Sequence, residues 1–153
     1  MLPLKRIVCP TDFSEPSFEA LQAAVELARH FSAELIVIHV VQPIPLVAAE
    51  HMGSVVFNVQ AYQEEMEQAA LKKLQQQMAE RIAAGLAVRP LVALGDPADQ
   101  IVRAADEAQA DLIVIATRGQ TGFKRLVFGS VAEKVVRLAG TPVLSIRGSR
   151  DEG

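Results

Sequence analysis

A loop that carries glycines and leads into a capped helix is the part of this 153-residue chain best suited to bind an anion. The apolar run 112–116 is typical of a strand buried on both faces, and Gly119 and Gly122 follow it. Ser130 and Glu133 stand three residues apart, as in a capping box, which predicts that a helix begins at Ser130. Free backbone N–H groups converge at a helix N-terminus, where the helix dipole favours negative charge, so this stretch indicates a phosphate site.

The spacing of the glycines excludes two well-known phosphate loops, G-x-x-x-x-G-K-[ST] and G-x-G-x-x-G. Instead, Gly119 is followed after nine residues by Gly129 and Ser130. The glycines could also be turn residues only, but a close approach of backbone to phosphate requires residues without a side chain. We therefore favour ligand binding over a purely structural role.

Pro10 closes the first predicted strand, and a polar turn with Asp12 and Ser14 follows it. Asp12 could cap the next helix, since Glu15 stands three positions on, or contact a ligand, or do both. Cys9, at the end of the strand, is interpreted as a small core residue, with a redox-sensing thiol as the alternative. The three histidines show no metal-ligand spacing, so no metal site is predicted.

Composition limits the classes of function. The formal net charge of −3 disfavours nonspecific nucleic-acid binding, which requires clustered positive charge. No apolar run approaches the roughly 20 residues that a membrane helix needs, and the N-terminus does not resemble a signal peptide. The single cysteine is compatible with a reducing compartment. We expect a soluble cytoplasmic protein.

Strands and helices alternate along the chain, which predicts an α/β domain with a mostly parallel sheet over residues 1–147 and a polar tail over 148–153. Strands are predicted at 4–9, 34–41, 87–94, 112–116 and 142–146. Helices are predicted at 17–31 and 61–84, from Pro97 after an Asp96 cap, and from Ser130. Pro90 predicts that the third strand lies at an edge of the sheet.

The second predicted helix follows a long segment that is rich in apolar residues. Apolar residues form a stripe along that helix, which predicts its buried face: Met66, Ala70, Leu74, Met78 and Ile82. Residues 42–60 contain prolines and a glycine yet are largely apolar. A loop that long is usually functional or disordered, so a flap over a ligand, a dimer contact and disorder all remain open.

Several motifs in order make the chain resemble the universal stress protein family over nearly its whole length. They are G-x2-G-x9-G-[ST] with Ala116 at the first glycine, IVCPTDFSEPS, HVV, GDPADQIV and TPVLSIR. The resemblance implies a Rossmann-like (HUP-like) sheet of five strands in order 3-2-1-4-5, with four helices on both faces. Ligands bind such sheets beyond the carboxyl ends of the strands, where the strand order reverses.

The resemblance also implies a site for ATP, ADP or AMP, with Mg²⁺ able to accompany the nucleotide. Asp12 would accept hydrogen bonds from the ribose hydroxyls, and Pro10, Thr11 and Val40 would line the adenine slot. The implied phosphate loop comprises Ala116, Arg118, Gly119, Gly122, Gly129, Ser130 and Val131, which act mainly through backbone N–H groups. Ala116 in place of glycine would impair the loop only if that position needs a positive φ.

Three functions follow as hypotheses: a nucleotide-binding regulatory protein, an ATPase or phosphotransferase, and a scaffold without nucleotide. Phosphoryl transfer needs a metal and a positioned nucleophile, and residues 116–129 contain no acidic residue, so we favour the binder. The resemblance implies a homodimer through the fifth strand, from Thr141 to Arg147, an edge whose apolar residues could pair with a second copy. Other protein partners and the pathway are not predicted.

Overall fold

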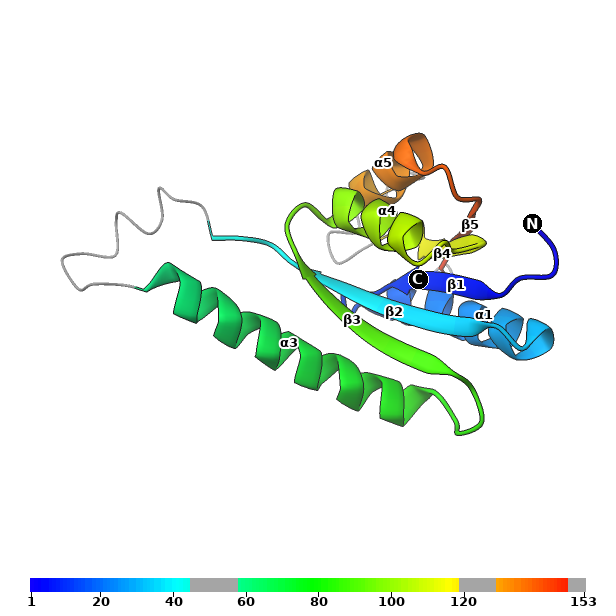
Figure 1. Ribbon diagram of the computed structural model, residues 1–153, viewed down its shortest axis with the longest axis horizontal. Helices are drawn as coiled ribbons and strands as arrows, with labels where there is room; N and C mark the ends of the chain where they lie inside the picture. Colours follow the sequence, from blue (N-terminus) through cyan, green and yellow to red (C-terminus); the bar gives the residue numbers. More distant parts are fainter. Residues whose placement is uncertain (45–57, 119–128, 149–153) are drawn as a thin grey trace, which may run out of the picture.

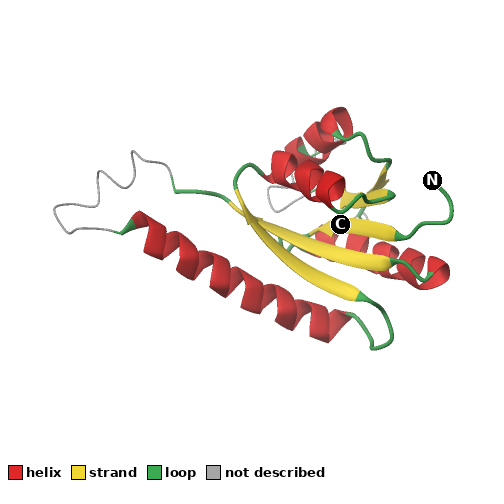
Figure 2. Ribbon diagram, viewed as in Figure 1, coloured by secondary structure: helices red, strands yellow, loops and turns green. Residues whose placement is uncertain are grey.

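The computed structural model describes residues 1–44, 58–118 and 129–148. At its centre is a parallel sheet of five strands in the order β3-β2-β1-β4-β5 (Figures 1 and 2). The strands are β1 (Arg6–Pro10), β2 (Glu34–Val41), β3 (Val88–Leu94), β4 (Leu112–Ala116) and β5 (Val143–Ile146). The predicted fold class and strand order are therefore confirmed, and β2 and β4 have the predicted bounds.

Four helices in the described part of the chain cover the two faces of this sheet (Figure 1). They are α1 (Glu15–Phe31), α3 (Val59–Arg81), α4 (Pro97–Glu107) and α5 (Ser130–Leu138). Apolar residues of α1 and α3 pack into one buried cluster with the sheet, and those of α4 and α5 pack into a second. The sheet is therefore the middle layer between two cores, as predicted.

The central strands contribute to both cores because successive side chains point to opposite faces of a sheet. Leu35 and Val37 of β2 belong to the cluster with α1, whereas Ile36 and Ile38 belong to the cluster with α4. All four side chains are at most 1% exposed. Burial on both faces explains why these four residues form a continuous apolar run in the sequence rather than an alternating one.

The long helix α3 packs on the sheet only along its C-terminal half, which corrects the predicted buried stripe. Leu74 is the buried residue of this helix, and Met78 and Ile82 pack against the same cluster, but Met66 and Ala70 do not. A 23-residue helix is about 35 Å long and a 7-residue strand about 23 Å, so the N-terminal half extends beyond β3 (Figure 1). No helix in the described ranges, α3 included, is long and apolar enough to cross a membrane.

The two edges of the sheet are β3 and β5, as predicted. Pro90 lies within β3, opposite Val37 of β2, and an edge strand tolerates a proline whose nitrogen faces away from the ladder. β5 is only four residues long and pairs with β4 on one side. Pro90 in β3 and the short length of β5 fit the usual ways in which proteins limit pairing at an edge.

Asp111 connects the first strand to the start of β4. Its Oδ2 accepts hydrogen bonds from the backbone N–H groups of Lys5, at 2.7 Å, and Arg6, at 3.0 Å. These two bonds stabilise the charged carboxylate and lower the pKa of Asp111 from its ordinary value. Because the folded-state pKa is lowered, the stabilisation is present above the unfolded pKa of about 3.9 and disappears as the pH falls through the folded value.

We therefore expect Asp111→Ala to lower the free energy of unfolding at pH 7 by about 1 kcal/mol, a figure reduced for the exposure of these hydrogen bonds. The loss should shrink in acid, where the wild-type carboxylate is itself protonated. Urea unfolding of both proteins at neutral pH and at a pH below about 3 measures this difference. An equal loss at both pH values would contradict a charge-dependent role for Asp111.

Candidate functional site

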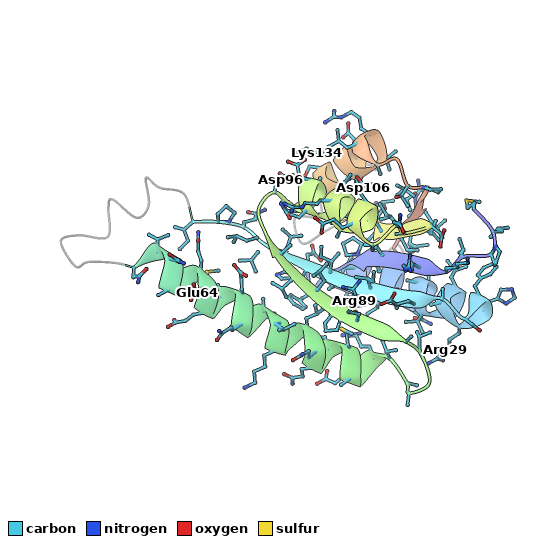
Figure 3. The ribbon with its side chains drawn as sticks, viewed as in Figure 1. Arg29, Glu64, Arg89, Asp96, Asp106 and Lys134 are labelled. Carbon is cyan, nitrogen blue, oxygen red and sulfur yellow. The ribbon has the colours of Figure 1, made fainter. Side chains whose placement is uncertain are left out.

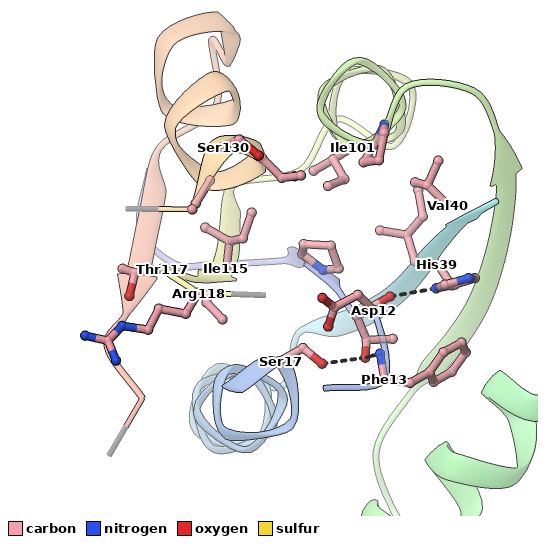
Figure 4. A pocket seen from close by; sticks show the side chains of 18 of the residues that line it. Asp12, Phe13, Ser17, His39, Val40, Ile101, Ile115, Thr117, Arg118 and Ser130 are labelled. Atoms are coloured by element: carbon pink, nitrogen blue, oxygen red, sulfur yellow. Dashed lines mark hydrogen bonds between the residues drawn. The ribbon is translucent and has the colours of Figure 1, made fainter. Parts of the chain in front are cut away.

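A pocket of about 510 Å³ lies at the carboxyl ends of β1, β2 and β4 (Figure 4). This volume falls in the range of small-molecule sites, about 300–1,000 Å³. Its lining is formed by Pro10, Thr11, Asp12, Phe13, Ser17, Ile38, His39, Val40, Gln42, Pro97, Ile101, Ile115, Ala116, Thr117, Arg118, Gly129, Ser130, Val131 and Ala132. The strand order reverses between β1 and β4, so the pocket occupies the switch point of the sheet.

Every predicted site residue that the structure describes lines this pocket. These residues are Pro10, Thr11, Asp12, Val40, Ala116, Arg118, Gly129, Ser130 and Val131. The remaining two, Gly119 and Gly122, lie outside the described residues. The structure thus brings together two segments more than a hundred residues apart, while their contacts with a ligand remain predictions.

Ala116, which replaces the first glycine of the motif, is the last residue of β4. It is not among the described non-glycine residues with positive φ, which are Phe13, Ser32 and Gln109. The alanine methyl group therefore introduces no backbone strain at this position. The backbone of Ala116 can therefore take the position that the first glycine of the motif would have.

The N-terminus of α5 opens into the pocket, but its cap differs from the prediction. Gly129 is the N-cap residue, with φ −67° and ψ 154°, and its carbonyl accepts from the Glu133 N–H at 3.0 Å. Ser130 is therefore the first helical residue, and the predicted capping box with Glu133 is wrong. The N–H groups of the first helical turn, Ser130 to Ala132, lack partners within the helix and lie at the pocket, as an anion site requires.

A pair of ion contacts holds the start of α5 beside the start of α4. Asp96 is the N-cap of α4, as predicted, and accepts from the Asp99 N–H at 3.1 Å. Lys134 Nζ lies 2.9 Å from Asp96 Oδ2 and 3.1 Å from Asp99 Oδ1 (Figure 3). The hydrogen bond from Lys134 lowers the pKa of Asp96 and raises that of Lys134. Because all three side chains are partly exposed, these pairs contribute little to stability.

Asp12 lies in a tight turn between β1 and α1. Its Oδ1 accepts from the Ser14 N–H at 3.0 Å and from the Ser14 hydroxyl group. Ser14 is the N-cap of α1, because its side chain accepts from Ser17 N. The alternative interpretation of Asp12 as the helix cap is therefore wrong, and α1 begins at Glu15 rather than at the predicted Ser17.

Thr117 is a pocket residue that the sequence did not reveal. Its side chain is only 5% exposed, and its Oγ1 has no hydrogen-bond partner within residues 1–44, 58–118 and 129–148. Its backbone N–H donates to Ile146 O at 3.0 Å, and its carbonyl accepts from the Gly129 N–H. Thr117 therefore connects the end of β4 to both β5 and the start of α5.

Apolar side chains form one wall of the pocket. Ile38 and Val40 come from β2, Ile115 from β4, and Pro97 and Ile101 from the first turns of α4. Figure 4 labels Val40, Ile101 and Ile115. Only Val40 was assigned to the site from the sequence, because the helical spacing of Ile101 also fits a core residue. A flat apolar ring is the kind of group that such a wall accommodates.

His39 and Phe13 form the rim beside this wall. His39 Nδ1 lies 2.9 Å from the Thr11 carbonyl oxygen, which can only accept, so Nδ1 carries the proton. The His39 and Phe13 rings have centroids 4.4 Å apart, and Lys73 Nζ of α3 lies 4.3 Å from the centroid of the Phe13 ring. Sequence spacing excluded His39 as a metal ligand but gave no sign of this packing.

Asp12 is the one carboxylate among the described pocket residues, and Arg118 the one guanidinium. In Figure 4 the Arg118 guanidinium is turned away from Asp12. The described ranges contain no group of three or more His, Cys, Asp or Glu residues that could hold a metal ion. A metal at this site would therefore depend on ligand atoms as well as protein atoms.

Cys9 lies within β1 beneath the pocket and is fully buried. Burial raises the pKa of the Cys9 thiol to about 12. The thiol is therefore protonated at neutral pH and lacks the thiolate that reacts with oxidants. This supports the interpretation of Cys9 as a core residue over the redox-sensing alternative.

Comparison with known proteins finds similarity along nearly the whole chain. Residues 3–147 match the Universal stress protein family. Universal stress protein MJ0531 of Methanocaldococcus jannaschii is 40% identical over 148 residues, which are 97% of this chain and 85% of that protein.

Solved structures share the fold. MJ0577 of Methanocaldococcus jannaschii has a TM-score of 0.81 and 26% identity, covering 97% of this chain and 99% of its own. A universal stress protein in complex with cAMP has a TM-score of 0.65 and 26% identity, with 95% and 98% coverage. The Archaeoglobus fulgidus protein in complex with dAMP has a TM-score of 0.56 and 25% identity, with 95% and 99% coverage.

Proposed function

The chain belongs to the universal stress protein family, and we propose that it is a regulatory protein of the stress response. It would bind an adenine nucleotide, ATP, ADP or AMP, in the pocket at the carboxyl ends of β1 and β4. The observation that carries this proposal is the meeting of Asp12 and the open N-terminus of α5 across one pocket. Two structural relatives are complexes with cAMP and dAMP, which supports a ligand of this class.

Each part of the pocket suits one part of a nucleotide. The apolar wall around Val40 and Ile101 offers a surface for the adenine ring. Asp12 provides carboxylate oxygens for the ribose hydroxyls, and the free N–H groups at Ser130 and Val131 suit the phosphates. Arg118, close to the phosphate end, would need to turn inward to add its charge.

The role we propose is binding rather than catalysis. Phosphoryl transfer requires a held metal and an oriented nucleophile in addition to phosphate-binding groups. Asp12, the one carboxylate that the described pocket residues supply, already accepts from Ser14 and is assigned to the ribose. Mg²⁺ would accompany the phosphates of the nucleotide.

We propose further that the protein acts as a homodimer in the cytoplasm, with nucleotide occupancy shifting its contacts with other proteins. The dimer would form through β5, an edge strand followed by Arg147. Leu144 on this strand and Val136 and Leu138 on the neighbouring helix are large apolar side chains that the single chain leaves exposed. A second copy would remove them from water.

The test is calorimetric titration of the wild-type protein and of Asp12→Ala with ATP, ADP and AMP. We expect wild type to bind at least one of them, and Asp12→Ala to lose about 1.5–3 kcal/mol of binding free energy, or roughly ten- to hundredfold in affinity. The melting temperature should change little, since Ser14 rather than Asp12 caps α1. Absence of binding by folded wild type at millimolar ligand would instead favour the scaffold hypothesis.

A further inference from the structure

A short chain of hydrogen bonds lies beneath the turn that carries Asp12. Thr11 Oγ1 is 2.8 Å from Ser17 Oγ, and Ser17 Oγ is 2.7 Å from the carbonyl oxygen of Ser14. Thr11 and Ser17 are each 5% exposed, so water does not compete for these contacts. Figure 4 shows the hydrogen bond of Ser17 beside Asp12.

The direction of each proton in this chain follows from counting donors. A hydroxyl group has one proton, and a carbonyl oxygen can only accept. The Ser17 hydroxyl therefore donates to the Ser14 carbonyl, and Thr11 must donate to Ser17 Oγ. Thr11 Oγ1 in turn accepts from the Phe13 N–H at 3.1 Å. Ser17 thus acts as acceptor toward Thr11 and as donor toward Ser14.

These bonds stabilise a turn whose backbone is not relaxed. Phe13 has a φ of 65°, in the left-handed region that bulky residues rarely adopt. Its N–H is bonded to Thr11 Oγ1, and its ring packs on His39. A conformation of this kind persists only where surrounding contacts specify it.

Asp12 sits between the residues that Ser17 holds. Thr11 precedes it, and Ser14 follows two positions later and donates both its N–H and its hydroxyl proton to Asp12 Oδ1. The direction of the Asp12 carboxylate therefore depends on where Ser14 lies. Ser14 is in turn fixed by the Ser17 hydroxyl at its carbonyl oxygen.

We propose that Ser17 is a positioning residue of the nucleotide site, whose hydroxyl holds Thr11 and Ser14 so that Asp12 meets the ribose hydroxyls. Resting on the proposed function, this role extends the site to a side chain on α1 that acts through Asp12. A purely structural Ser17 would affect every ligand of the pocket equally. A positioning Ser17 affects only ligands that carry ribose hydroxyls.

The test compares ATP with 2′,3′-dideoxy-ATP, which lacks both hydroxyls, by calorimetry on four proteins: wild type, Asp12→Ala, Ser17→Ala and Val25→Ala. Val25 lies on the same helix, is buried and does not line the pocket, so its truncation controls for lost stability. We expect wild type to prefer ATP by at least about tenfold and Asp12→Ala to show no preference. Ser17→Ala should reduce the preference to about twofold without weakening the binding of dideoxy-ATP, because only the Asp12 carboxylate, the acceptor for the ribose hydroxyls, is then misdirected. Val25→Ala should keep the full preference.

The outcomes separate the two proposals. If Ser17→Ala lowers the affinities for ATP and dideoxy-ATP equally, or leaves the preference for ATP unchanged, the positioning role is overturned while the proposal of nucleotide binding stands. Failure of wild type to bind either ligand overturns the proposed function itself. Ser17→Cys serves if Ser17→Ala does not fold, since a thiol group is only slightly larger than the hydroxyl group and, as a weaker donor, should also reduce the preference.

Discussion

Gly129→Val is expected to abolish nucleotide binding while leaving the protein folded. Gly129 lies at the pocket as the N-cap of α5, where a valine side chain would occupy the space through which a phosphate reaches the Ser130 and Val131 N–H groups. Its backbone, with φ −67° and ψ 154°, is extended, a conformation that valine can also adopt. Valine is a poorer N-cap than glycine by about 1 kcal/mol, so the melting temperature should fall by only a few degrees.

Gly140, just beyond the other end of α5, offers a matched control. A Cβ atom there would meet nothing within 4 Å, so Gly140→Val tests the substitution without approaching the pocket. Circular dichroism and calorimetric titration of both variants separate folding from binding. Undiminished affinity in Gly129→Val would show that the phosphates do not lie at the start of α5.

The strands were the most predictable part of the fold, for a physical reason. β4 and the centre of β2 are buried on both faces, so continuous apolar runs mark these two strands in the sequence. The strand order, in contrast, was implied by the family resemblance, because hydrophobic periodicity carries no information about which strands pair. Periodicity was also misleading for α3, because its apolar stripe predicted burial along the whole helix but the sheet covers only part of its length.

The start of α1 and the cap of α5 were mispredicted because several capping residues stand together. Asp12 and Ser14 precede α1 and Ser17 lies in its first turn, and the capping role falls to Ser14, whose backbone is extended at φ −79° and ψ 156°. At α5 the extended residue is Gly129, so the neighbouring Ser130 enters the helix. Local sequence does not decide between neighbours when the dihedral angles depend on the tertiary path of the chain.

The predicted pocket residues are those that a spacing motif can reveal, and the others depend on contacts between elements. His39 joins the site by bonding to Thr11, 28 positions away, and Thr117 by its bonds to Ile146 and Gly129. Such contacts leave no periodic signal in one sequence. The chemistry of the pocket was therefore partly predictable, but the network that orients Asp12 was not.

The proposed homodimer depends on which backbone groups of β5 face outward. Alternate residues of a strand direct their backbone polar groups to the same side. The carbonyls of Pro142 and Ile146 accept from Ile113 and Thr117, so the backbone of Leu144 also faces β4. Val143 and Ser145 therefore present their N–H and C=O groups at the open edge, whereas a proline at Leu144 would disturb the pairing of β5 with β4.

Ser145→Pro is accordingly expected to convert a dimer into a folded monomer. It removes an outward N–H group and places a ring where a second β5 strand would pair, while the bonds to β4 remain. Ser145→Ala keeps the N–H group and should remain dimeric, since the Ser145 side chain does not take part in the ladder. Multi-angle light scattering with circular dichroism distinguishes the three proteins at micromolar concentration. A monomeric wild type would overturn the homodimer itself. A Ser145→Pro variant that stays dimeric would exclude pairing through β5 and favour an interface at the exposed Val136 and Leu138 of α5.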